Sequence, residues 1–201
     1  LTLDEIVWTG PQSTIAEMSA KVGIKDTYTL EKMKAYLSQR EVHYLPVYRP
    51  EHVVFLTSLL DRSYTEVDLE YSVSFIKVVA AQRAVKSPEE LLSLHEAASI
   101  TSQIHLCLMQ QAKAGMKEYE LASRVRQVAH EQNVNISFQP IVTIDGQILH
   151  NHYYGNTLSG GDLLLCDAGA ESSHLYAGDM TRTFPVDPTF STLQKELYDV
   201  V

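Results

Sequence analysis

Two aspartates, Asp167 and Asp179, lie in consecutive segments that have the pattern of a β-hairpin. Asp167 follows an apolar run that begins at Leu163, and Asp179 begins an alternating run that Pro185 ends. A hairpin tip at residues 172–174 places the two aspartates directly opposite each other. Like charges in that arrangement repel, so we expect a cation between them, and carboxylate oxygens favour a hard divalent cation.

A second interpretation of the same residues needs no metal. Asp167 then opens a turn at Asp-Ala-Gly, and Asp179 forms a salt bridge with the nearby Arg182. Residues three apart on a strand point to opposite faces, which disfavours that ion pair. The spacing alone leaves both interpretations open, because a shift of one residue in register turns a side chain to the other face of the sheet.

Two histidines, His150 and His152, follow a predicted strand at residues 136–144 and a turn at Asp145-Gly146. A histidine beside a cleft donates a hydrogen bond to a substrate carbonyl, or takes a proton, at neutral pH. From the pattern alone, either histidine is more often a plain loop residue than a catalytic one. The remaining candidates are assigned to the scaffold or to the hairpin tip: His95, His105, His130 and His174.

The elements that must position these residues indicate an α/β (α+β) protein. Ser87, Pro88 and Glu90 mark a helix start, and an apolar stripe with helical spacing follows. A second helix ends around Asn133. The part before residue 82 is predicted to be mixed α/β without a catalytic cluster, with strands at 7–8, 42–47 and 71–79, helices after Ser13 and Thr29, and no assignment for 50–60.

The composition excludes several functional classes. The formal charge of −9 argues against a nucleic-acid or anionic membrane surface. No apolar run is long enough to span a membrane, and Leu1 does not begin a signal peptide. Cys107 and Cys166 are expected to be buried and reduced, because two cysteines do not form a disulfide framework. A cytoplasmic protein is therefore expected.

The region around the aspartates resembles the Xaa-Pro aminopeptidase (aminopeptidase P) and prolidase family, whose pita-bread catalytic fold also occurs in methionine aminopeptidase and creatinase. The resemblance covers about residues 85–201, and more loosely the part before. Its motifs are Asp167-Ala-Gly-Ala-Glu171, Tyr176-Ala-Gly-Asp179-Met-Thr-Arg-Thr-Phe-Pro-Val186, Ser137-Phe138, Pro140-Ile141-Val142, Ile148-Leu149-His150, Gln194 and Tyr198.

The resemblance implies an N-terminal domain like that of aminopeptidase P at 1–82, incomplete at its start, and the first half of a pita-bread metallopeptidase domain at 83–201. It implies hydrolysis of Xaa-Pro bonds in peptides or dipeptides with two divalent ions, manganese being expected. Asp167 would bind one ion and Asp179 would bridge both. His150 would contact the substrate and stabilise the transition state, and His152 would replace it in another loop register.

The sequence departs from the family pattern in two ways. Asp167 and Asp179 are twelve positions apart, one more than usual, which a hairpin tip absorbs but a strand accommodates only with a bulge. The family's later histidine and two glutamate ligands, and its glutamate general base, have no counterpart before Val201. We therefore expect this chain to be part of a longer enzyme and to be inactive alone.

The implied partners are a proline-containing peptide and, in the full-length enzyme, further copies of the chain as a homo-oligomer. The alternatives are a creatinase-like or non-catalytic peptide-binding member of the same fold, and a structural or oligomerisation module. A methionine aminopeptidase is disfavoured by the N-terminal unit and by the run from Thr181 to Pro185. The sequence does not distinguish aminopeptidase from dipeptidase action.

Overall fold

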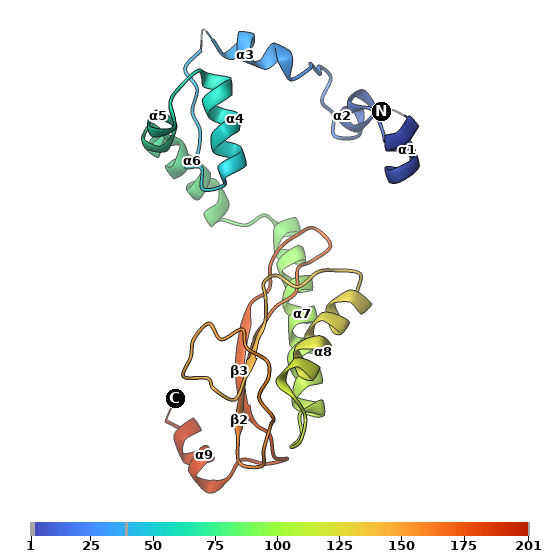
Figure 1. The fold of residues 1–201 in the computed structure, drawn as a ribbon, viewed down its shortest axis with the longest axis vertical. Coiled ribbons are helices and arrows are strands. Elements are labelled where there is room, and N and C mark those ends of the chain that lie inside the picture. Colours follow the sequence, from blue (N-terminus) through green and yellow to red (C-terminus); the bar gives the residue numbers. More distant parts are fainter. Residues whose placement is uncertain (1–2, 39, 201) are drawn as a thin grey trace. The chain divides into compact units, whose positions relative to one another are not determined.

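The computed structural model describes residues 3–38 and 40–200 and contains both helices and a β-sheet (Figure 1). The chain divides into two compact units, Leu1–Val85 and Lys86–Val201. Within the described residues, the named strands all belong to the second unit. The predicted α/β fold class is confirmed.

The first unit consists of short helices with a small apolar core. Tyr44, Val53 and Val67 are buried, and Val67 is fully inaccessible. Two of the helices begin with a reciprocal serine or threonine cap, at Thr14 and at Ser63. The helices are α1 (Leu3–Thr9), α2 (Ile15–Lys21), α3 (Glu31–Leu37), α4 (Pro50–Leu60), α5 (Tyr64–Leu69) and α6 (Val73–Ala84).

The strands predicted for the first unit are wrong. Residues 7–8 lie within α1, and 42–47 join no strand ladder among the described residues. The segment 71–79 is β-branched in part, but Ser72 caps it by accepting a hydrogen bond from the Phe75 amide at 3.2 Å. The helix-favouring residues 80–84 then extend it as α6, so local capping and propensity outweigh the β-branched content.

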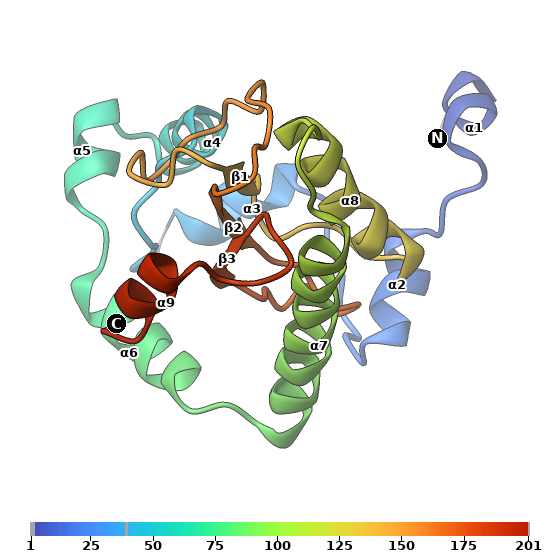
Figure 2. The same cartoon turned by 90° about the horizontal axis from the view of Figure 1, so that it is seen from below.

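The second unit places two helices against a three-stranded antiparallel sheet of order β1-β2-β3. The helices α7 and α8 lie side by side along one face of the sheet (Figures 1 and 2). No helix in residues 3–38 and 40–200 is long and apolar enough to cross a membrane. The elements are α7 (Pro88–Gln111), α8 (Glu118–Glu131), β1 (Ile141–Thr143), β2 (Leu163–Ala168), β3 (Met180–Pro185) and α9 (Thr192–Tyr198).

The start of α7 is the predicted one. The Ser87 hydroxyl accepts from the Glu90 amide at 3.2 Å, and the Glu90 carboxylate accepts from the Ser87 amide at 2.7 Å. Pro88 occupies the first turn, where its missing N–H costs nothing. The buried stripe has helical spacing and includes Ala97, Ile100, Thr101, Ile104, His105 and Leu108.

The side chains of the central strand β2 alternate between the buried core and the opposite face of the sheet. Leu164, Cys166 and Ala168 are buried, whereas the alternate residues Leu163, Leu165 and Asp167 are only half-buried. The buried set belongs to the core that α7 and α8 complete. Asp167 therefore points to the face of the sheet that the helices do not cover.

Both cysteines are free thiols. Burial raises the pKa of the Cys166 thiol to about 12, so this thiol stays protonated at neutral pH. Cys107 is only partly buried, which corrects the expectation that both cysteines lie in the core.

Candidate functional site

The predicted hairpin forms, but its register differs from the prediction. Asp167 opposes Thr181, not Asp179. The reason is the tip, which is centred on His174 instead of the residue before it: the Ser172 amide donates to the Tyr176 carbonyl at 2.8 Å. Leu175 adopts a left-handed conformation with φ of 65°, which lets the chain turn back at this point.

The two aspartates nevertheless share one face of the hairpin. Asp179 precedes Thr181 by two residues, so strand alternation directs it to the same face as Asp167. Such diagonal neighbours lie about 7–8 Å apart in a regular ladder, farther than a directly opposed pair. The prediction that the two carboxylates are directly opposed and repel each other is therefore wrong. The two carboxylates are related instead by lining the same pocket.

That location is an open pocket of about 460 Å³ that also receives the loop histidines. His150 and His152 both line it, so the structure brings together all the candidate residues that the sequence indicated. Asp167 is half-buried, whereas Asp179 and both histidines are exposed. The remaining lining residues had no role assigned from the sequence, although two of them belong to the motifs of the family resemblance: Phe138, Gln139 and Ile141.

A threonine hydroxyl orients the inner aspartate. The Thr181 Oγ1 donates to the Asp167 Oδ1 at 2.8 Å across the strand pair. One oxygen of Asp167 thus has a protein partner. Strand alternation with the correct register would have identified Thr181 from the sequence.

Two glycines allow close backbone packing beside the aspartates, Gly169 against the neighbouring segment of the hairpin and Gly178 against α7. A Cβ atom on Gly169 would lie 1.8 Å from the carbonyl oxygen of Gly178, and one on Gly178 would lie 2.3 Å from the Thr101 Oγ1. Ser137 is hydrogen-bonded to both glycines: its amide donates to the Gly169 carbonyl at 3.0 Å, and its hydroxyl donates to the Gly178 carbonyl at 2.5 Å. The sequence signal is a glycine two residues after Asp167 and another directly before Asp179.

The hairpin tip is fastened to the first half of α7. The Tyr176 hydroxyl donates to a Glu90 carboxylate oxygen at 2.8 Å, and the Ser173 hydroxyl donates to Glu96 at 3.1 Å. His174 lies at this tip and is not among the residues that line the pocket. The tip therefore serves to anchor the strand that leads to Asp179.

A buried histidine lies behind the strand that carries Asp167. His105 of α7 is 2% exposed, and its Nε2 is 3.4 Å from the Ala168 carbonyl oxygen. Burial lowers the pKa of His105, and the contact with Ala168 offsets part of that effect. The prediction that His95, His105 and His130 are surface or packed residues is confirmed, since the other two are exposed.

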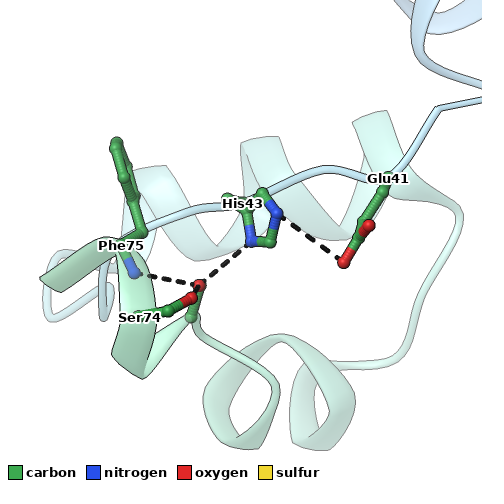
Figure 3. Close-up of polar contacts among 5 residues, drawn as sticks. Glu41, His43, Ser74 and Phe75 are labelled. Atoms are coloured by element: carbon green, nitrogen blue, oxygen red, sulfur yellow. Dashed lines mark hydrogen bonds and ion pairs between the residues drawn. The ribbon is translucent and has the colours of Figure 1, made fainter. Parts of the chain in front are cut away.

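The first unit contains a Glu-His-Ser arrangement that the sequence did not indicate (Figure 3). The His43 Nδ1 lies 3.0 Å from the Ser72 hydroxyl, and its Nε2 lies 3.6 Å from Glu41. Ser72 is also within 2.9 Å of the Ser74 hydroxyl and accepts from the Phe75 amide as the cap of α6. Because Glu41 and His43 are exposed and Ser72 is used as a helix cap, the arrangement is better explained as capping than as a nucleophilic centre.

The pocket supplies part of a metal-ligand set. Among residues 3–38 and 40–200, no group of three or more His, Cys, Asp or Glu side chains is placed to hold a metal ion. Asp167 and Asp179 offer carboxylate oxygens on one pocket wall, which are donors that hard divalent cations accept. The chemistry of these donors fits such an ion, with further ligands needed to complete its coordination.

Comparison with known proteins gives consistent matches. Residues 93–201 match the profile of metallopeptidase family M24. A Haemophilus influenzae Xaa-Pro aminopeptidase is 30% identical over 202 residues, which cover 96% of this chain and 45% of the relative.

Solved structures agree with the sequence matches. A variant of Escherichia coli aminopeptidase P in complex with substrate has a TM-score of 0.83 and 29% identity, covering all of this chain and 48% of the other. The zinc-substituted E. coli enzyme with product has a TM-score of 0.83 and 28% identity, with the same coverage. The chain thus has the aminopeptidase P fold and spans about half the length of the relatives that it matches.

Proposed function

Because the chain belongs to metallopeptidase family M24, we propose that it forms part of an enzyme that hydrolyses the peptide bond before proline, acting on peptides or dipeptides. The observation that carries the proposal is the pocket that Asp167 and Asp179 share with His150. The Xaa-Pro aminopeptidase relatives and the aminopeptidase P structures support the choice of substrate class.

Within this proposal, Asp167 and Asp179 hold divalent ions. Asp167 would hold one ion, with Thr181 fixing the orientation of its carboxylate, and Asp179 would contribute to holding both. When bound, such ions polarise a carbonyl and lower the pKa of water. Asp167 is half-buried, and the backbone beside both aspartates is closely packed at Gly169 and Gly178. Both features favour a fixed carboxylate pair, which a metal site requires.

His150 is the residue that we assign to the substrate. Its imidazole donates a hydrogen bond to the carbonyl oxygen of the scissile bond, where negative charge develops during hydrolysis. His152 lines the same pocket and remains the alternative for this role. Phe138 and Ile141 supply apolar surface on the pocket wall, which suits a pyrrolidine ring or a neighbouring side chain.

Several finer assignments accompany this proposal. We propose manganese as the native ion, a cytoplasmic location consistent with two free thiols, and a homo-oligomer for the whole protein. We also propose that residues 1–82 are an N-terminal domain like that of aminopeptidase P. Residues 83–201 would then be the first half of the catalytic domain.

The 201-residue chain mixed with excess manganese and an Xaa-Pro peptide is expected to show little or no hydrolysis. Two of the ligands that the family resemblance implies lie in its pocket, and the general base is not among them. Release of the amino-terminal residue, followed by chromatography, checks this expectation. Robust hydrolysis that a chelator stops would show that the chain alone completes its metal site.

A further inference from the structure

We propose that Glu118, a buried residue at the start of α8, positions the loop that carries His150 and His152 at the pocket. The loop spans residues 144–156 between β1 and β2. Glu118 is fully inaccessible to solvent and touches neither histidine in any hydrogen bond that the structure shows. It therefore acts through the loop backbone as a positioning residue.

The carboxyl group of Glu118 binds both ends of the loop. Its Oε1 accepts from the Ile144 amide at 2.9 Å, where the chain leaves β1. Its Oε2 accepts from the Asn156 amide at 3.2 Å, where the chain returns. The Asn156 side chain also donates to Oε1, at 3.1 Å. One buried side chain thus joins the two ends of the loop and fixes their separation.

The returning end is further tied to α8 by backbone bonds. The Glu118 amide donates to the Asn156 carbonyl at 3.1 Å, and the Tyr119 amide donates to the Tyr154 carbonyl at 3.0 Å. The Tyr154 hydroxyl donates to the Pro140 carbonyl, just before β1. These bonds hold the loop base as one unit with α8 and the sheet, and Glu118 lies at its centre.

A second set of hydrogen bonds fixes the part of the loop that contains the histidines. The Thr143 Oγ1, at the end of β1, accepts from the Asp145 amide at 3.0 Å and from the Asn151 Nδ2 at 3.3 Å. Asn151 lies between the two histidines in the sequence. Asn156 links both sets, because its Nδ2 also donates to the Asp145 Oδ2 at 3.0 Å.

The direction of the loop follows from the sheet. Thr143 pairs with Leu165, and Ile141 pairs with Asp167, so Thr143 lies on the same face as Asp167. A loop held to Thr143 through Asn151 therefore folds over the face that carries the aspartate. His150 and His152 are exposed, so their position depends on these bonds more than on packing of their own.

The test compares Glu118→Gln with Glu131→Gln, which removes the same charge from the other end of α8, where Glu131 is exposed. A glutamine amide keeps one acceptor and introduces two donors, so one end of the loop loses its partner. We measure backbone amide order parameters in the 201-residue chain by NMR. The order parameters of the backbone amides of residues 147–152 are expected to fall from about 0.85 to below about 0.6 in Glu118→Gln alone. The order parameters of β2 and β3 are expected to stay unchanged in both variants.

Unchanged loop order parameters in a folded Glu118→Gln chain would overturn the proposal. Should that variant fail to fold, Glu118→Asp decides, because it keeps the buried carboxylate and its charge but is one methylene too short to accept from the amides of both Ile144 and Asn156. A loop as rigid in Glu118→Asp as in the unmodified chain would likewise overturn the proposal.

The catalytic part of the inference rests on the proposed function, and a separate readout tests it. In the whole protein, Glu118→Gln is expected to lower kcat by about 10²-fold with KM changed less than about twofold, because a misplaced histidine affects the reaction more than binding. A looser loop with unchanged kcat would overturn the link from the loop to catalysis. Absence of any Xaa-Pro hydrolysis in the unmodified protein would instead refute the proposed function and leave the NMR result valid.

Discussion

Replacing Asp179 by asparagine in the whole protein is expected to lower kcat/KM for an Xaa-Pro peptide by about a thousandfold, which corresponds to about 4 kcal/mol of lost transition-state stabilisation. The carboxylate lies at the pocket, and an amide lacks the charge that binds a divalent cation. Asp167→Asn should have a comparable effect, since both residues belong to the same proposed site. Steady-state hydrolysis with saturating manganese measures both effects.

The matched control is Asp68→Asn, which removes one carboxylate from an exposed position on α5. It should leave kcat/KM within about twofold of the unmodified protein, because isolated surface charges contribute little. Activity within twofold in Asp179→Asn as well would contradict a role in catalysis. It would favour the alternative in which this fold serves only as a structural or oligomerisation module.

Replacing Gly169 by alanine is expected to destabilise the second unit by about 3 kcal/mol or more. The added Cβ would lie 1.8 Å from the Gly178 carbonyl oxygen and 2.6 Å from the Ser137 hydroxyl oxygen. The first of these neighbours is backbone, so the strands must move apart, and Asp179 moves with them. Urea unfolding of the 201-residue chain, followed by circular dichroism, measures the change.

Gly160→Ala provides the comparison for this substitution. Its Cβ would first meet a side-chain oxygen of Asp187, at 3.2 Å, and that carboxylate is able to rotate away. We expect a loss of less than about 1 kcal/mol there. If Gly169→Ala were no more destabilising than Gly160→Ala, the close backbone packing of Gly169 against Gly178 would be contradicted.

The hairpin and its aspartates were predictable because local signals agree. An apolar run, an alternating run and a polar tip define two antiparallel strands, and period-two alternation places Asp167 and Asp179 on one face. The register was not predictable, since it depends on the left-handed conformation of Leu175 and on tip bonds to α7. Neither feature has a signal in the residue pattern.

Tertiary contacts explain the other differences. The predicted strand at 136–144 is interrupted, because Pro140 has no N–H for the ladder; β1 remains at one end, and Ile136 forms only an isolated bridge with Ala170 at the other. The pocket residue Gln139 comes from this irregular segment. In the same way, Glu118 has the sequence signature of an ordinary first-turn glutamate, and only the fold shows that it is buried at the base of the histidine loop.

A creatinase-like enzyme or a peptide-binding relative of the same fold would also retain the pocket. Both alternatives predict that the carboxylates hold no metal. Asp167 and Asp179 would then serve packing or substrate contact without binding an ion. Metal content therefore separates these alternatives from a metallopeptidase more directly than activity does.

The central claim is that Asp167 and Asp179 hold divalent metal ions. The most direct test is the metal content of the whole protein after manganese loading and dialysis, measured by plasma mass spectrometry. We expect about two ions per chain in the unmodified protein and in Asp68→Asn, and a loss of at least one ion in Asp179→Asn. A full metal complement in Asp179→Asn, or none in the unmodified protein, would contradict the claim.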